Sequence, residues 1–391
     1  PYLWEAIKAG NKAENLQEQM AEQLQKWNPR TFDEFGEFVP LGNPFTLGDG
    51  TLTANTTVAE LFANPRLHKI DKNTRFTLQE HVDILIALGK HAGLSDEAIL
   101  TVILKPLSES GVRQNEDITA RQFTIRNPNP RATAGGLYQN NDPNWMTGLG
   151  EVFHPDFMGR FKDVPSLYNY LKHHKSLYES LPKEKKYDRS GNAYYGYKKT
   201  REYNYLLNLR TTSPFMAYFV NTAQTGNDHS AADKHLNEYS AGKEPKANRA
   251  NGLMYHVLGR GGARQFMEEM VKNNYANAGE DAVKFVRRNL KRGHTVVNGN
   301  RHIFYKTITR NGKKTLVSRT LGEVYKDYFW ESMQFSMDEE LGRIIINRFK
   351  SNAITPPFAL SGFDSTQAEQ PPPVETTTLT EEAFLRYNNN R

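Results

Sequence analysis

Apolar residues recur every three or four positions along much of this chain, which is the spacing that gives an α-helix one buried face. The clearest pair of such runs lies between Thr77 and Ile103. Thr77 and Glu80 form a capping box at the start of the first run, and Ser95 caps the second. These runs are the most apolar part of the chain, so we expect them to be core helices without a catalytic role.

The same spacing predicts helices in other parts of the chain, and we expect a mainly α fold of the α+β class. The predicted ranges are 57–63, 165–181, 231–239, 262–270, 280–292, 321–333 and 337–350. Residues 107–160 differ, because they contain few periodic runs and many Asn, Gly, Pro and Arg residues. We expect long loops or an irregular insertion there, a kind of segment that often carries function.

A change of period marks the segment that follows Gly293. Apolar and polar residues alternate there, and Asn298-Gly299 and Asn311-Gly312 are turn signals between short runs. The predicted strands are residues 295–297, 301–308 and 313–318. They would form a small antiparallel β-meander near residues 294–318.

Both ends of the chain have the character of interaction elements. Residues 1–29 contain an amphipathic helix that would pack either on its own core or, as an arm, on a neighbouring subunit. Its apolar stripe consists of Leu16, Met20, Leu24 and Trp27. Residues 353–391 are rich in Pro, Thr and Gln and predict a flexible tail. The short apolar motif of this tail, Phe384, Leu385 and Tyr387, would fray in isolation or fold against a neighbouring copy or another protein.

Two lobes are expected between these ends. Residues 30–160 would form a helical lobe with long loops, and residues 161–352 a basic helical lobe that includes the β-meander. The length of 391 residues is compatible with this division.

The composition excludes several classes of site. The chain contains no cysteine, which rules out disulfides, thiolate metal sites, iron–sulfur clusters and a cysteine nucleophile. It has neither a long uninterrupted apolar run nor a secretory signal, so we expect no membrane span and no export by that route. A virion or the cytoplasm of a host cell is the expected location. The formal net charge of +6 favours anionic partners.

The positive charge is concentrated in residues 283–322, a stretch without any acidic residue that we call the basic segment. Such a field attracts a polyanion such as nucleic acid, although a charge block is often only a solvated face. The candidate phosphate contacts are Lys284, Arg287, Arg288, Lys291, Arg292, Arg301, Lys306, Arg310, Lys313 and Lys314. A basic helix beside a basic hairpin would form a cradle for phosphates.

A second candidate surface is residues 168–205, the tyrosine segment, where nine tyrosines alternate with lysines and arginines. Aromatic rings stack on unpaired bases while cations neutralise phosphates, which is how single strands are bound without sequence specificity. The alternative is that several of these tyrosines belong to the core. The candidate contacts are Lys172, Lys175, Lys185, Lys186, Tyr194, Tyr195, Tyr197, Lys198, Lys199 and Arg201.

The glycine-rich residues 259–264 are the best candidate for an isolated phosphate site. Small residues let backbone amides approach an anion, and Arg260 and Arg264 would grip a backbone phosphate. The segment lacks the spacing of a nucleotide-binding loop, and a simple interhelical turn explains it equally well.

The sequence contains few patterns that are typical of catalytic or metal-binding sites. His229, Asp233 and His235 would converge on a metal only in an irregular segment, since on one helix the two histidines point apart. No serine-hydrolase or zinc-protease motif occurs. We therefore expect no cofactor, no metal and no catalytic residue.

These features together predict a structural protein that coats nucleic acid, of the viral nucleocapsid or coat type. It would bind single-stranded RNA largely without sequence specificity and self-assemble through its terminal arms. The alternatives are a nucleic-acid-processing enzyme that uses residues 107–160 and the Gly259 turn, and a virion or scaffold protein that binds acidic protein partners.

Overall fold

A computed structural model describes residues 52–109, 117–126, 133–187, 193–240, 246–273, 278–290, 293–310, 313–333 and 340–351. The predicted N-terminal arm and C-terminal tail lie outside these residues, and so do the two candidate phosphate contacts Lys291 and Arg292.

The described elements are mostly helices. Their bounds in the first half are α3 Val58–Ala63, η2 Pro65–Leu67, β1 Arg75–Phe76, α4 Leu78–His91, α5 Asp96–Glu109, β2 Ile118–Thr119, α6 Ala120–Thr124, α7 Asp142–Val152, α8 Pro155–Met158, η3 Gly159–Phe161, α9 Pro165–Glu179, β3 Lys183–Tyr187 and β4 Ala193–Tyr197. They continue with α10 Arg201–Thr212, α11 Pro214–Ser240, α12 Arg249–Lys272, α13 Ala282–Asn289, α14 Gly293–Gly299, α15 Arg301–Phe304, β5 Tyr305–Arg310, β6 Lys313–Ser318, α16 Leu321–Val324, η5 Tyr325–Trp330, η6 Glu331–Met333 and α17 Glu340–Ser351.

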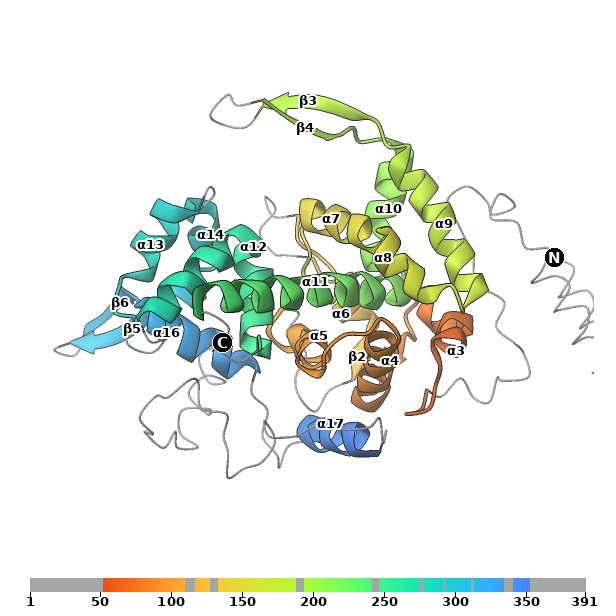
Figure 1. Ribbon diagram of the computed structural model, residues 1–391, viewed down its shortest axis with the longest axis horizontal. Coiled ribbons are helices and arrows are strands. Elements are labelled where there is room, and N and C mark those ends of the chain that lie inside the picture. The colour runs from red at the N-terminus through yellow and green to blue at the C-terminus, as the bar shows by residue number, and fades with distance from the viewer. Residues whose placement is uncertain are drawn as a thin grey trace, which may run out of the picture.

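Helix α11 is the central element of the fold. It packs against α4, α5, α7, α10 and α12, so that helices surround it along its length (Figure 1). Its first part, residues 215–220, is apolar on every side and fully buried. A helix that is hydrophobic all round requires neighbours all round, which explains its place.

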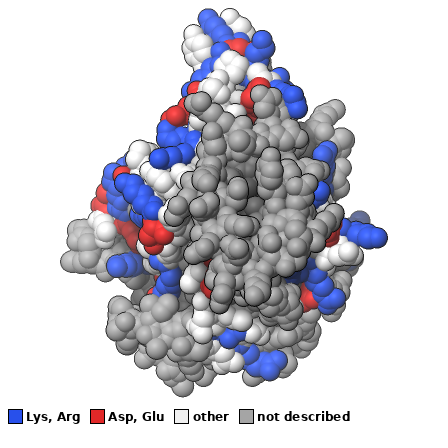
Figure 2. All heavy atoms as spheres, turned by 90° about the vertical axis from the view of Figure 1, so that its right-hand side faces the viewer, with Lys and Arg blue, Asp and Glu red and all other residues white. Residues whose placement is uncertain are grey.

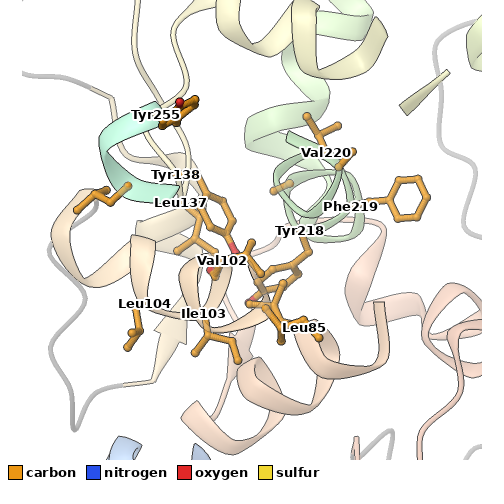
Figure 3. Packing of buried hydrophobic residues seen from close by; sticks show 14 of the residues in the cluster. Leu85, Val102, Ile103, Leu104, Leu137, Tyr138, Tyr218, Phe219, Val220 and Tyr255 are labelled. Carbon is orange, nitrogen blue, oxygen red and sulfur yellow. The ribbon is translucent and has the colours of Figure 1, made fainter. Parts of the chain in front are cut away.

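Aromatic side chains fill the core beside α11. Tyr218 contacts the rings of Phe76, Phe123 and Tyr138 edge to face. The hydroxyl of Tyr138 donates a hydrogen bond of 3.1 Å to the carbonyl oxygen of Val102 in α5. Figure 3 shows Tyr138 and Tyr218 around Val102 between these helices. A buried tyrosine hydroxyl needs such a partner, and here the bond ties the turn that contains Tyr138 to α5.

The mainly helical fold is confirmed, and the strands form three antiparallel two-stranded sheets within the described residues. Helix α4 begins at the predicted capping box, in which Thr77 and Glu80 exchange hydrogen bonds. The β5–β6 hairpin confirms the predicted strand at 313–318 and the end of the strand at 301–308.

Two parts of the sequence prediction are wrong. Residues 295–297 and 301–304 are helical, in α14 and α15, so the meander reduces to one hairpin. The loops expected in 107–160 give way to helices at 142–152 and 155–158. Helix α7 has its own start signal, because the side chain of Asn141 accepts a hydrogen bond from the amide of Asn144 and Pro143 occupies the first turn.

The boundary predicted near residue 160 stays a prediction. Helix α11, from the proposed second lobe, packs against α5 and α7 of the first. A single buried apolar cluster includes residues from Leu52 to Ile345. Among the described helices, none combines the length and the apolar character needed to cross a bilayer.

Three buried histidines, His81, His174 and His229, make the stability of the fold dependent on pH. Burial lowers the pKa of each of them, to about 4 for His81. His81 Nε2 donates to the carbonyl oxygen of Ile103 at 3.0 Å, and its Nδ1 accepts from the hydroxyl of Tyr218 at 3.2 Å. The folded state therefore holds the neutral ring.

We expect the free energy of unfolding to fall as the pH drops from 6.5 towards 4. The unfolded chain takes up protons below its ordinary histidine pKa, whereas the folded chain does not. His81 alone contributes about 3 kcal/mol of this loss. Replacement of His81 by Gln should remove that share, as measured by urea denaturation at pH 7 and at pH 4. An unchanged pH dependence in the variant would contradict the assignment of a neutral His81.

Candidate nucleic-acid interface

The β3–β4 hairpin projects from the body of the molecule beyond α9 and α10 (Figure 1). The two strands are antiparallel, with Lys183 opposite Tyr197 and Lys185 opposite Tyr195. Because side chains alternate between the faces of a strand, Lys183, Lys185, Tyr187, Tyr195 and Tyr197 share one face. That face is a mixed array of lysines and tyrosines.

Three rings of the hairpin are exposed to solvent. Tyr187, Tyr194 and Tyr195 have relative exposures of 64%, 46% and 74%. Leu316 in β6 is the other large apolar side chain with comparable exposure among the described residues. Exposed aromatic rings gathered on one projecting element are a candidate interaction site, whereas scattered ones need no explanation.

Lysine side chains lie close to these rings. The Nζ of Lys185 lies 5.6 Å from the ring centroid of Tyr187, and that of Lys183 lies 5.4 Å from Tyr197. Lys186 differs, because its Nζ donates to the carbonyl oxygen of Tyr197 at 2.7 Å and lies 3.3 Å from a carboxylate oxygen of Glu184. Figure 2 shows Lys and Arg side chains on the surface of the projecting hairpin at the top of the molecule.

The other tyrosines of the tyrosine segment are structural. Tyr170 and Tyr203 are buried. Tyr197 is half-buried at the base of the hairpin, and its hydroxyl donates a hydrogen bond of 2.7 Å to the hydroxyl of Tyr178. The two explanations considered for the segment therefore apply to different residues: the tip of the hairpin exposes its rings, and the base anchors the hairpin to α9.

The remaining predicted cations of the tyrosine segment lie near this hairpin. Lys198, Lys199 and Arg201 are exposed directly after β4. On α9, Lys172 is exposed and its Nζ lies 4.9 Å from the ring of Tyr168, whereas Lys175 forms an ion pair with Glu179.

The basic segment forms a separate surface, made by α13 to α15 and the β5–β6 hairpin, on the side of the molecule toward which the β3–β4 hairpin points (Figure 1). The side chain of Asp281 caps α13 through the amide of Lys284, and the helix exposes Lys284, Arg287 and Arg288. The guanidinium of Arg301 lies 5.6 Å from the ring centroid of Tyr305.

Acidic residues from outside the basic segment neutralise part of it. Arg288 lies 2.7 Å from a carboxylate oxygen of Glu280, and Lys306 forms an ion pair with Glu323. By contrast, Arg287, Lys313 and Lys314 are exposed and form no ion pair within the described part of the chain. For Arg310 only the backbone, in β5, is described. The open positive charge is thus smaller than the sequence indicates.

The glycine-rich residues 259–264 form a kink inside α12. Gly259 has a φ of 68°, a left-handed conformation that glycine adopts without strain, and the helix resumes directly after it. Arg260 lies 2.8 Å from Asp228 and 2.6 Å from Glu151, measured between side-chain nitrogen and oxygen atoms. Arg264 donates to the hydroxyl of Tyr239 at 2.9 Å and lies 3.3 Å from Glu238. The geometry favours the structural turn, because both arginines already contact carboxylates.

A buried charged network lies beneath Arg260, and the sequence did not predict it. Lys105 is fully buried in α5, and its Nζ lies 3.4 Å from the hydroxyl of Thr225. Burial lowers the pKa of Lys105 to about 8, although nearby Asp228 opposes the shift. Burial also raises the pKa of Asp228. The one signal in the sequence is a lysine that follows a long apolar run.

The residues considered for metal binding have other partners. His229 Nε2 lies 2.7 Å from the hydroxyl of Thr101, and His235 Nδ1 lies 2.5 Å from that of Tyr255. In the ranges that the structure describes, no three His, Asp or Glu side chains are grouped as metal ligands would be.

Comparisons with models of protein families, with curated proteins and with solved structures find no match for this chain.

Proposed function

We propose that this chain is a structural protein of the nucleocapsid or coat type, which binds single-stranded nucleic acid, with RNA favoured, and coats it largely without sequence specificity. The observation that carries the proposal is the exposure of Tyr187, Tyr194 and Tyr195 among the lysines of the β3–β4 hairpin. Every base has a flat face that stacks on such rings, so the contact tolerates any sequence.

The form of the hairpin supports this proposal. A two-stranded hairpin without a core of its own is only marginally stable in water. This one is anchored at its base, through Tyr197 and Tyr178, while its tip presents aromatic surface to solvent. Contact with a ligand would cover that surface.

The basic segment would contribute sequence-independent attraction. Arg287, Lys313 and Lys314 are exposed cations that would neutralise phosphates and release counterions. Self-assembly would use the terminal arms, with Leu16, Met20, Leu24 and Trp27 at one end and Phe384, Leu385 and Tyr387 at the other. These arms lie outside the described residues and enter the proposal from the sequence.

Size-exclusion chromatography of protein purified at low salt tests the proposal. Absorbance is recorded at two wavelengths, so that nucleic acid and protein are distinguished. We expect a large particle that contains nucleic acid and shrinks after nuclease treatment. Binding of a fluorescent single-stranded RNA should weaken linearly on a logarithmic salt scale, with a slope of roughly −0.7 for each neutralised phosphate. The same assay with a DNA strand of matched sequence shows whether the protein prefers RNA or DNA.

A nucleic-acid-free monomer whose RNA affinity is absent or insensitive to salt would contradict the proposal. Assembly that persists in nuclease-treated material would instead support a scaffold protein that binds acidic partners.

A further inference from the structure

Helix α17 comes last among the described elements and lies against α4 at the edge of the molecule (Figure 1). Leu341 and Ile345 of α17 are buried, one turn apart on the same helix face. A helix of twelve residues is marginal in isolation, so its stability comes from the surface that it covers. We call the α4 surface beneath it the seat.

The seat contains a buried charge that only α17 neutralises by an ion pair within the described residues. Asp83 in α4 has a side-chain exposure of 1%, and Arg348 of α17 lies 2.9 Å from its carboxylate oxygen. Removal of α17 would leave Asp83 without this counter-ion and uncover apolar surface on α4. An empty seat is therefore unfavourable, and any α17 that presents Leu341, Ile345 and Arg348 would fill it.

The packing between α17 and the seat is incomplete. A hollow of about 380 Å³ remains between the start of α4, Asp117 and α17, lined on the α17 side by Arg343, Ile344 and Asn347. Burial raises the pKa of Asp83 to about 6, and the attraction of Arg348 offsets this only in part. Incomplete packing makes α17 easier to release than the fully buried first part of α11.

We propose that α17 of one copy occupies the seat on α4 of a second copy when the protein assembles. Every chain carries one seat and one α17, so exchange creates no contact that the single chain lacks and costs little. Because the giving and the receiving surfaces differ, the exchange either closes reciprocally between two copies or extends head-to-tail from copy to copy. This inference rests on the self-assembly in the proposed function and adds the surface and the partner.

Cross-linking with introduced cysteines tests this exchange, because the chain has no cysteine of its own. Gln79 and Asn347 are exposed and line the same hollow, one on α4 and one on α17. The variants Gln79→Cys and Asn347→Cys, carried on two full-length chains with different tags, are co-expressed and treated with a short bis-maleimide. We expect a covalent product that contains both tags, at least tenfold above the product from either variant expressed alone.

The chain that carries both cysteines is the reference for seating within one copy. If it forms an internal cross-link while the co-expressed single variants form no joint product, the exchange is overturned.

A second measurement uses charge. Asp83→Arg and Arg348→Asp should each reduce assembly, the double variant should restore it, and the mixture of the two single variants should restore it as well. Recovery in the double variant without recovery in the mixture would also overturn the exchange.

The same samples separate this inference from RNA binding. Cross-linking is carried out before and after nuclease treatment, and RNA affinity is measured on the cross-linked material. A joint product without RNA affinity refutes the coating function alone, whereas RNA affinity without a joint product refutes the exchange of α17 alone.

Discussion

Replacement of Tyr187, Tyr194 and Tyr195 by alanine together is expected to weaken the binding of single-stranded RNA by about a hundredfold or more. Stacking of one base on an aromatic ring contributes about 1–3 kcal/mol, and the three rings are exposed at the tip of the β3–β4 hairpin. The salt dependence should change little, because no cation is removed. Fluorescence anisotropy with a labelled RNA at several salt concentrations measures both quantities.

Leu316→Ala is the matched control for this triple variant. Leu316 is 50% exposed on the β5–β6 hairpin of the basic segment, so its loss removes exposed apolar surface but neither an aromatic ring nor a cation. The control should bind RNA normally, and both proteins should keep the unfolding midpoint of the parent chain, since these side chains pack little in the folded state. Normal affinity in a folded triple variant would rule out stacking on this hairpin.

The two faces of the hairpin allow a finer test. Tyr187 and Tyr195 share one face, and Tyr194 lies on the other. If the RNA strand follows the face with Lys183 and Lys185, the Tyr187/Tyr195 double variant should lose more affinity for RNA than Tyr194→Ala does.

Replacement of Gly293 by alanine is expected to reduce the free energy of unfolding by about 3 kcal/mol or more. A Cβ atom at this position would overlap the carbonyl oxygen of Val286 and lie 2.6 Å from the Cα of Arg287. Both are backbone atoms of α13, so relief requires α13 and α14 to separate. Urea denaturation followed by circular dichroism measures the loss.

Gly299→Ala in the same helix is the control for Gly293→Ala. No atom lies within 4 Å of the corresponding Cβ position, and alanine favours a helix by up to about 1 kcal/mol over glycine. The control should therefore be as stable as the parent chain or slightly more so. Equal stabilities for the two variants would contradict the close approach of α14 to α13.

The sequence predicts an element well where one face of that element is buried and the other is solvated. Helix α4 follows this rule, and its capping box marks its start. The first part of α11 breaks the rule, since burial on every side leaves no stripe to detect, and only its last residues were predicted. The β3–β4 hairpin breaks it in the opposite way, because its tip buries neither face. The local signal for that hairpin is Ser190-Gly191, a turn dipeptide ahead of the tyrosine-rich residues 193–197.

In residues 295–297 the local sequence and the tertiary packing favour different structures. Two adjacent valines between a glycine and an Asn-Gly pair favour a strand locally. In the structure Val297 is buried and Gly293 contacts α13, so tertiary packing selects the helix.

The sequence likewise predicts only part of the candidate interface, because tertiary contacts decide which cations and which rings are exposed. The sequence identifies a stretch without acidic residues, but Glu280 and Glu323 approach Arg288 and Lys306 from just outside it. Similarly, nine neighbouring tyrosines give no indication of which rings are buried. The answer depends on how the base of the hairpin meets α9, and the hydrogen bond between Tyr197 and Tyr178 settles it.

The separation of the hairpin tip from the core has an evolutionary consequence. Substitution of Tyr218 or Trp145 disturbs the packing around α11, so these positions tolerate little change. Tyr187, Tyr194 and Tyr195 are exposed, so their replacement is expected to cost little stability. Substitutions at these exposed rings and substitutions in the core are therefore separable in evolution, because a change on the surface of the hairpin alters the folding of the body little.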